Sequence, residues 1–151
     1  MLELNNAHAP HVTVIDADEL QSLIDQAFHV GVRDEGRDAF VIALDQDADY
    51  GSPNFRWFKE RLPRFLYVDR IVVSTDARGK GVGRELYEDL FKIGIATGHS
   101  VLACEVNVDP PNPISDRFHA ALGFEEIGRA PDLRWSKIVR YLIKRLSDSD
   151  R

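Results

Sequence analysis

Residues 74–90, STDARGKGVGRELYEDL, place glycines and basic residues between an apolar run and an amphipathic segment. Glycines let main-chain N–H groups turn toward a ligand, and the start of a following helix adds a partial positive charge. Arg78, Lys80 and Arg84 supply full positive charges beside the glycines. The pattern therefore favours binding of a pyrophosphate group without a metal ion. A tight strand-to-helix turn with solvated charges is the competing interpretation.

The two best-known nucleotide loops do not match this segment. A mononucleotide loop needs Ser or Thr after its Gly-Lys pair and a glycine five positions before that pair. Gly81 and Ser74 occupy those places here. A dinucleotide fingerprint needs a third glycine three positions after its second. That place holds Arg84 or Leu86, depending on which glycine pair is chosen. The segment is therefore a different kind of phosphate cradle, or a turn.

Two carboxylates, Asp69 and Glu105, stand inside apolar segments that are typical of neighbouring strands. An acid among apolar residues is costly unless it is hydrogen-bonded or hydrated, which favours a site that lines a cleft. A carboxylate in such a site can take a proton from a bound group. Both residues are therefore candidate catalytic bases.

Strand alternation predicts which neighbours these acids have. Asp69 is expected to share a face with Tyr67 and Ile71, and Glu105 with Ala103 and Asn107. The competing interpretation is a structural salt bridge, for which the candidate pairs are Asp69 with Arg140 and Glu105 with Arg70.

Hydrophobic periodicity and capping residues predict the elements that position these groups. A strand before residues 78–84 (the glycine segment), then a helix and a second strand, imply a right-handed parallel crossover. The expected elements are a helix over 16–28, two strands over 28–46 with a turn near 35–37, a short helix over 52–63, a buried strand over 64–75, a helix from 82 to a cap at Gly98, a strand over 100–108, a helix over 112–124, and strands over 124–130 and 136–146.

Composition narrows the class of protein. A formal net charge of -6 disfavours nucleic-acid binding, which relies on Lys and Arg contacts to phosphate. Cys104 is the only cysteine, so an internal disulfide and a cysteine-based metal cluster are excluded. The N-terminus lacks signal-peptide features, and no run reaches the roughly 18 apolar residues of a membrane span. We expect one cytoplasmic domain over residues 1–151, with no membrane or nucleic-acid partner.

Two segments resemble a known family. Residues 78–83, RGKGVG, follow a predicted strand, precede a helix, and resemble the Arg-x-x-Gly-x-Gly/Ala acyl-CoA motif of the GCN5-related N-acetyltransferase (GNAT) superfamily. Residues 112–124, NPISDRFHAALGF, are similar to the family's Asn-x-x-Ala-x-x-Phe-Tyr-x-x-x-Gly-Phe helix. The element order from 12 to 146 also suits that fold. The resemblance implies an α/β (α+β) fold with a mixed, mostly antiparallel sheet, a parallel, splayed central strand pair, and helices on both faces.

The resemblance also implies acetyl-CoA as the cofactor, with no metal. Main-chain N–H groups of the glycine segment would bind its pyrophosphate, and the strand before it would pair with the pantetheine arm. Asn112 would contact that arm from the far side while capping its own helix. The N–H of Val72 or Val73 would stabilise the oxyanion. The cofactor-binding residues are thus predicted to be Ile71, Val72, Val73, Arg78, Gly79, Lys80, Gly81, Val82, Gly83, Arg84 and Asn112.

The second segment departs from the family pattern at its acid. The family's tyrosine there often protonates the departing thiolate, and this chain has His119. Histidine titrates near neutral pH and can donate a proton as imidazolium, so His119 is the predicted acid. Ser115 stands where the family usually has alanine.

The function implied by the resemblance is acetyl-CoA-dependent transfer of an acetyl group to a primary amine of a small molecule or peptide, by direct attack in a ternary complex. Tyr50, Phe55 and Trp57 are predicted to form an apolar wall for the acceptor if the connection over 46–64 folds over the cleft, although these aromatic residues would equally suit the core. A non-catalytic acyl-CoA-binding or regulatory module, a scaffold without cofactor, and a homodimer all stay open.

Overall fold

The computed structural model of the chain describes residues 1–8, 12–109 and 111–150. In chain order its helices and strands are α1 (Leu2–Asn6), α2 (Ala17–Gln26), β1 (His29–Arg33), β2 (Ala39–Asp45), α3 (Pro53–Lys59), β3 (Leu66–Val73), α4 (Val82–Ala96), β4 (Val101–Asp109), α5 (Pro113–Ala121), β5 (Glu125–Asp132) and β6 (Lys137–Arg145), with 3-10 turns at Asp34–Gly36 and Asp148–Asp150.

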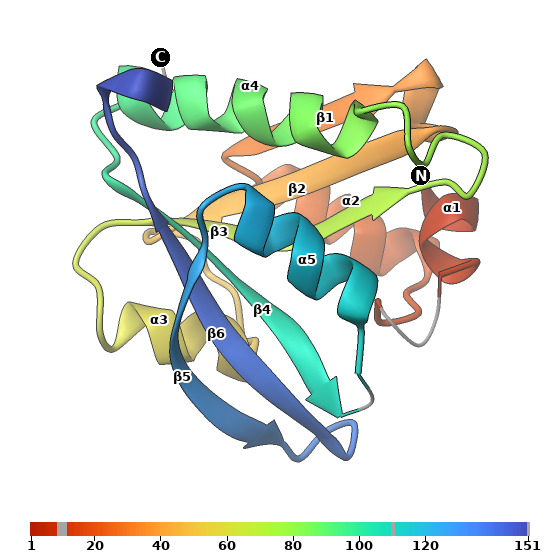
Figure 1. The fold of residues 1–151 in the computed structure, drawn as a ribbon. Coiled ribbons are helices and arrows are strands. Elements are labelled where there is room, and N and C mark those ends of the chain that lie inside the picture. The colour runs from red at the N-terminus through yellow and green to blue at the C-terminus, as the bar shows by residue number, and fades with distance from the viewer. Residues whose placement is uncertain (9–11, 110, 151) are drawn as a thin grey trace.

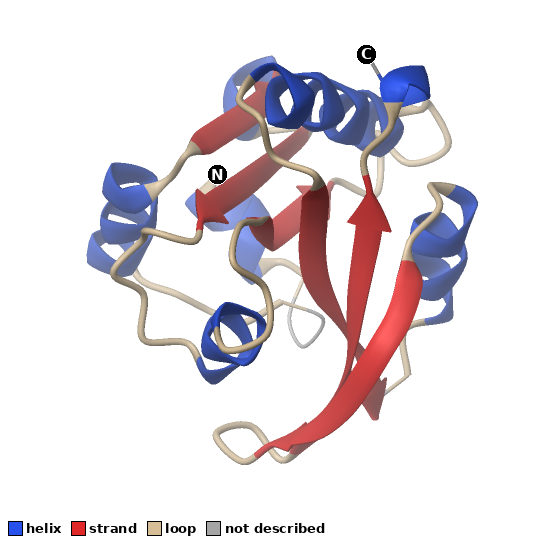
Figure 2. Cartoon of the chain, turned by 90° about the vertical axis from the view of Figure 1, so that its left-hand side faces the viewer, coloured by secondary structure: helices blue, strands red, loops and turns tan. Residues whose placement is uncertain are grey.

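Six strands of the described residues form one sheet in the order β1-β2-β3-β4-β6-β5. Neighbouring strands are antiparallel except β3 and β4, which run parallel. Two antiparallel halves therefore meet at a parallel pair in the middle of the sheet, and Figure 2 shows these halves diverging. The predicted mixed, mostly antiparallel sheet is confirmed.

Helices cover both faces of the sheet (Figure 1). On one face, residues of α4 and α5 pack in a core cluster with Val41 of β2 and Leu66 of β3. On the other face, α2 packs with Phe40 of β2, and α3 packs with Tyr67 of β3 and Tyr141 of β6. The predicted two-sided cover is confirmed.

Local sequence signals begin and end the helices as expected. Asp16 caps α2 by accepting a hydrogen bond from the N–H of Glu19 at 2.8 Å. Ser52 caps α3, and proline occupies its first turn. Just beyond the end of α4, Gly98 has a φ of +78°, the left-handed conformation that lets a chain leave a helix. Helix α1 is the element that hydrophobic periodicity does not predict.

Candidate active site

The parallel strands β3 and β4 are paired only at their start. Leu66 pairs with Leu102 and Tyr67 with Ala103, and the described residues record no further pair between these strands. Beyond this point both strands line a cavity of about 830 Å³, together with residues from α2, α4, α5 and the hairpin between β5 and β6. The splayed central pair predicted from the family resemblance is confirmed.

A β-bulge in β3 lies at the point where the strands diverge. Across the pair with β2, Ala43 faces Val68 and Ile42 faces Arg70, so Asp69 is the extra residue. A bulge of this kind breaks the strict alternation of side chains along a strand. It therefore decides which side chains of β3 reach each face of the sheet.

The bulge reverses the faces that simple alternation predicts. Val68 and Ile71 both pack against the core on the α4 side. Asp69, in contrast, accepts a hydrogen bond from Tyr50 on the opposite side. The prediction that Asp69 shares a face with Ile71 was wrong, because the extra residue shifts the alternation by one position from Arg70 onward.

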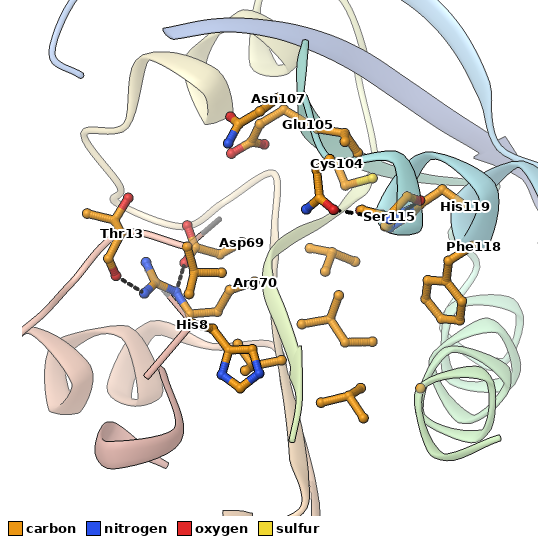
Figure 3. Close-up of a pocket in the computed structure, with 18 of the residues that line it drawn as sticks. His8, Thr13, Asp69, Arg70, Cys104, Glu105, Asn107, Ser115, Phe118 and His119 are labelled. Carbon is orange, nitrogen blue, oxygen red and sulfur yellow. Dashed lines mark hydrogen bonds and ion pairs between the residues drawn. The ribbon is translucent and has the colours of Figure 1, made fainter. Parts of the chain in front are cut away.

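Asp69 is held in a buried ion pair. Its carboxylate accepts hydrogen bonds from Arg70 Nε at 2.7 Å and from the Tyr50 hydroxyl at 2.6 Å. The side chains of Asp69 and Arg70 are 5% and 8% exposed. Arg70 Nη1 also donates to Asn5 Oδ1 at 2.9 Å and to the Thr13 carbonyl at 3.2 Å. Figure 3 shows this pair on one side of β3. Asp69 is therefore a fixed, compensated charge.

The salt bridges predicted from sequence are not the ones that form. Arg70 pairs with Asp69 and not with Glu105. Arg140 pairs with Asp116 of α5 and not with Asp69. The salt-bridge interpretation therefore holds for Asp69 with a different partner, because the bulge places Asp69 and Arg70 on the same face of the sheet.

Glu105 of β4 has a different environment. Its carboxylate accepts hydrogen bonds from the Tyr67 hydroxyl at 2.7 Å and from the Asn54 amide at 3.3 Å. None of the ion pairs among the described residues involves it. Burial raises the pKa of Glu105 to about 7, and the nearby charge of Asp69 adds to the rise while the hydrogen bonds oppose it. A carboxylate with this pKa can accept a proton near neutral pH.

Asn54 of α3 connects Glu105 to the hairpin between β5 and β6. Its amide nitrogen lies 3.3 Å from Glu105 Oε1 and 3.3 Å from Asp132 Oδ2. Its amide oxygen accepts a hydrogen bond from the Tyr141 hydroxyl at 2.9 Å. Asp132 in turn binds Arg134, which lowers the pKa of the Asp132 carboxyl. The two carboxylates therefore lie on either side of one fixed amide group.

The glycine segment leads directly into α4. Gly81 is the N-cap residue with a φ of +78°, and no side chain caps the helix. The first helical hydrogen bond runs from the N–H of Glu85 to the carbonyl of Gly81 at 3.0 Å. The N–H groups of Val82, Gly83 and Arg84 therefore have no partner within the helix. They form the positive end of a helix long enough to attract an anion.

The segment uses its glycines for two purposes. Gly79 and Gly81 both have a φ of +78°, and a Cβ at either position would meet no atom within 4 Å. These positions need glycine for backbone conformation, and the space above them is open. Gly83 is crowded, because a Cβ there would lie 3.1 Å from Phe118 and 3.3 Å from Val73. It lets α4 pack closely against β3 and α5.

Most of the predicted cofactor residues line the cavity. They are Ile71, Val72, Val73, Arg78, Gly79, Gly81, Val82, Gly83, Arg84 and Asn112, whereas Lys80 is not among the lining residues. One N–H of the segment is already used, since that of Arg78 donates to the Ser74 carbonyl at 3.1 Å. The turn itself therefore engages the N–H of Arg78, and the contacts of the segment with a pyrophosphate stay a prediction.

Residues 34–124 match the model of the acetyltransferase (GNAT) family, which is more than half of the chain. The chain belongs to the GNAT acetyltransferase family. Among curated proteins it is similar to the L-2,4-diaminobutyric acid acetyltransferase of Wolinella succinogenes, with 28% identity over 92 residues. The match covers 60% of this chain and 53% of the relative, so it spans about half of the relative's length.

Solved acetyltransferase structures share this GNAT fold. Chaetomium thermophilum Naa20, in complex with a bisubstrate analogue, has a TM-score of 0.71 at 19% identity, with 96% of this chain and 80% of that chain covered. YncA of Salmonella typhimurium with acetyl-CoA has a TM-score of 0.66 at 18% identity, covering 97% and 87%. The Escherichia coli ribosomal-protein-S18-alanine N-acetyltransferase has a TM-score of 0.64 at 17% identity, covering 97% and 86%.

His119, which stands at the GNAT tyrosine position, is buried. Its Nδ1 lies 2.8 Å from the Ser115 carbonyl, which can only accept, so Nδ1 carries the proton. Its Nε2 lies 2.7 Å from the Tyr87 hydroxyl and, in the neutral ring, accepts a hydrogen bond from it. Burial lowers the pKa of His119, although the Ser115 carbonyl opposes this shift. The lowered pKa favours a neutral imidazole, and the role of His119 as an acid stays a prediction.

Asn112 caps α5 as predicted. Its Oδ1 accepts a hydrogen bond from the N–H of Ser115 at 3.3 Å, and it also lines the cavity. The side-chain nitrogen has no hydrogen-bond partner recorded among the described residues, so the cap leaves it for a ligand. The contact to the pantetheine arm stays a prediction.

The aromatic residues predicted for the acceptor wall divide into two groups. Tyr50 lines the cavity, but Phe55 and Trp57 are not among its lining residues. Phe55 is 1% exposed and packs in the α3 core cluster. Trp57 stacks on Tyr141 with ring centroids 4.0 Å apart. The structure supports the core interpretation for Phe55 and Trp57, and their contact with an acceptor stays a prediction.

Several polar residues of the cavity were not found from the sequence. Asn54 and Tyr67 orient Glu105, Asp132 and Arg134 lie at the hairpin end, and Tyr87 holds His119. Tyr67 was placed on the correct face by alternation, and Asp132 and Arg134 are close neighbours in one hairpin. The contacts of Asn54 with Glu105 and of Tyr87 with His119 join elements far apart in the chain. No spacing rule within one element could reveal them.

Among the described residues, no helix is both long and apolar enough to cross a membrane. The same residues contain no group of three or more His, Cys, Asp and Glu side chains arranged to hold a metal ion.

Proposed function

We propose that this GNAT chain, as a single acyltransferase domain, moves an acetyl group from acetyl-CoA to a primary amine by direct attack in a ternary complex. The observation that carries the proposal is one continuous cavity that joins the start of α4 to Glu105. The first end suits a pyrophosphate, and the second suits an amine. Acetyl-CoA would supply the activated acetyl group between them.

The residues at the start of α4 fit the cofactor. The N–H groups of Val82, Gly83 and Arg84 lie at the positive end of a fifteen-residue helix. The space above Gly79 and Gly81 is open, so a bulky diphosphate meets no side chain there. The side chains of Arg78 and Arg84 line the same cavity. Lys80 is proposed to act from outside the cavity through its charge alone.

Strand β3 would provide the contacts for the acyl end. The N–H of Ser74 donates to the Asp38 carbonyl, toward β2, at 2.7 Å. Because N–H groups alternate in direction along a strand, those of Ile71 and Val73 point away from β2 and toward the cavity. Of the two oxyanion candidates, Val73 is therefore favoured over Val72. Its N–H would stabilise the negative charge that develops on the carbonyl oxygen.

Glu105 would act as the base. An acceptor amine is mostly cationic at neutral pH, and it must lose a proton before it attacks. Glu105 borders the cavity without a paired cation, and burial raises its pKa to about 7. Asp69 already neutralises Arg70, which makes it the weaker candidate for this role.

The names of similar acetyltransferases support an amine as the acceptor. The curated relative is named for a small diamino acid, and the Escherichia coli structure is named for the alanine of a ribosomal protein. We propose a small-molecule or peptide amine accordingly.

To test acetyl transfer, the purified protein is mixed with acetyl-CoA and each amine of a panel, and the release of free thiol is measured. Thiol release that depends on the amine, together with a mass increase of one acetyl group on that amine, is the expected result. Tight CoA binding without thiol release from any amine would overturn the enzymatic proposal.

One observation favours the alternative, a non-catalytic acyl-CoA-binding or regulatory module. His119 stands at the acid position, and burial lowers its pKa, which favours the neutral ring. Such a module would bind CoA and release no thiol. The enzymatic proposal does not require an acid at this position, because a free thiol has a pKa of about 8.5 and its thiolate is a stable leaving group.

The backbone conformation of Gly81 gives a direct test of the cofactor site. Gly81→Val is expected to weaken CoA binding about tenfold or more, because a β-branched residue at positive φ is strained and displaces the adjacent N–H groups. Calorimetric titration with CoA measures the effect. Gly81→Asn is the matched control, since asparagine tolerates this conformation and should retain most of the affinity. Equal affinities for both variants and the native protein would contradict the proposed cradle.

A further inference from the structure

Arg134 is held in a fixed position at the tip of the hairpin between β5 and β6. Its Nε donates to Asp132 Oδ1 at 3.0 Å, and its Nη2 donates to Asp132 Oδ2 at 2.9 Å. Asp132 is itself only 4% exposed and is bound by Asn54. The guanidinium is therefore oriented before any ligand arrives, and little side-chain entropy remains to be lost.

The Arg134 side chain is 40% exposed and lines the cavity. Its bonds to Asp132 use the Nε edge, and no hydrogen bond of Nη1 is recorded among the described residues. The edge formed by Nη1 and Nη2 matches the planar, two-oxygen shape of a carboxylate.

This edge lies a short distance from the proposed base. One amide nitrogen of Asn54 is within 3.3 Å of both Glu105 and Asp132, and Asp132 contacts Arg134 directly. A molecule with an amine at Glu105 and an anion at Arg134 therefore needs only a few bonds between the two groups. The Asp69 and Arg70 pair is self-compensated, so it does not compete for either group.

We propose that the acceptor is a short amine that carries a carboxylate, with its amine at Glu105 and its carboxylate on the outer edge of Arg134. This inference rests on the proposed acetyl transfer. It narrows the acceptor to compounds in which a carboxylate lies a few bonds from the amine, a spacing that the C-terminal carboxylate of a polypeptide does not provide for its N-terminal amine. Binding adds no covalent step to the reaction.

The test compares amines that differ only by the carboxylate. The pairs are 4-aminobutyrate with propylamine and 2,4-diaminobutyrate with 1,3-diaminopropane. For each pair the measured quantity is the ratio of kcat/KM values, with the carboxylate over without it. The ratio is expected to exceed ten in the native protein, and Arg134→Gln should lower it about ten- to a hundredfold, since a charge-assisted contact of this kind contributes about 1.5–3 kcal/mol.

Two further variants serve as controls for a structural disturbance caused by Arg134→Gln. Arg129→Gln changes an exposed arginine of the same hairpin that pairs with Glu126 and does not line the cavity. It should leave the ratio unchanged. Arg134→Lys keeps the charge without the planar fork, and an intermediate ratio is expected. A native ratio near one, or a ratio that Arg134→Gln does not change, would overturn the inference.

Equilibrium binding separates this inference from the proposed function. Calorimetric titration of 4-aminobutyrate into the protein with CoA present measures the affinity of the carboxylate site even if no acetyl group is transferred. Binding that Arg134→Gln removes, without turnover of any amine, would refute acetyl transfer and retain the carboxylate site. Turnover of plain amines with equal or better kcat/KM would retain acetyl transfer and refute the carboxylate site.

Discussion

Glu105→Gln is expected to lower kcat for amine acetylation by about 10²–10⁴-fold, the usual contribution of a general base. Glutamine preserves the shape of the side chain but cannot take a proton. Its amide oxygen can still accept from Asn54, whereas its NH2 group can only donate to the Tyr67 hydroxyl. CoA affinity should stay within about twofold, because the glycine segment and α4 do not contact this side chain. Steady-state thiol release and calorimetry with CoA measure the two quantities.

The dependence of the reaction rate on pH gives a second test of Glu105 as the base. Burial raises the pKa of Glu105 to about 7, so the fraction of charged base increases as the pH rises through about 7. The rate should therefore increase through this window and level off above it. In Glu105→Gln the increase near pH 7 should disappear. An unchanged rate and an unchanged profile in this variant would exclude Glu105 as the base.

The raised pKa of Glu105 also predicts how the stability of the folded protein depends on pH. Because the folded-state pKa is above the unfolded value of 4.5, the folded protein holds an extra proton between about pH 4.5 and 7. This contribution to stability is fully present below pH 4.5 and is lost as the pH rises through about 7. Glu105→Gln should therefore be at least as stable as the native protein at pH 8. Loss of activity without loss of stability would separate catalysis from folding.

Asp69→Asn is expected to destabilise the fold by about 3–5 kcal/mol, the cost of leaving a buried charge without its partner. Arg70 is 8% exposed and its other contacts, Asn5 and Thr13, are uncharged, so no other group replaces the lost carboxylate. Urea denaturation measures the free energy of unfolding. Replacing both residues, as Asp69→Leu with Arg70→Met, should recover part of the loss because no unpaired charge remains.

A surface ion pair gives the matched control for this prediction. Glu125 pairs with Arg145 at 3.1 Å, and their side chains are 55% and 72% exposed. Glu125→Gln should change the free energy of unfolding by less than about 1 kcal/mol. If Asp69→Asn instead leaves stability intact and lowers kcat about a hundredfold or more, Asp69 regains its place as a candidate base.

The glycine segment and the helix caps could be predicted because they depend on residues close together in the chain. Gly81 lies at the start of α4 with positive φ, and Asn112 caps α5. Hydrophobic periodicity likewise placed β3 and β4 as buried central strands, which the sheet order confirms. The family match then agrees with the resemblance that these motifs carry.

The bulge at Asp69 could not be predicted from alternation. Nothing in the residues of β3 marks an extra position, because its register depends on the pairing with β2. The bulge changed the partner of Asp69 to Arg70 and moved Ile71 to the other face. The two acids that looked equivalent in the sequence thereby acquired different roles, one paired and one not.

The sequence by itself indicated the family, the glycine segment before α4 and the order of the elements from α2 onward, since these follow from local spacing and from motifs within single elements. Only the tertiary structure distinguished the surroundings of the two acids, one paired with an arginine and one not. The carboxylate of Glu105 accepts hydrogen bonds from Tyr67 of β3 and Asn54 of α3. Asn54 also donates a hydrogen bond to Asp132 of β5. Burial, hydrogen bonding and a shifted pKa arise where distant segments meet, and local patterns do not contain that information.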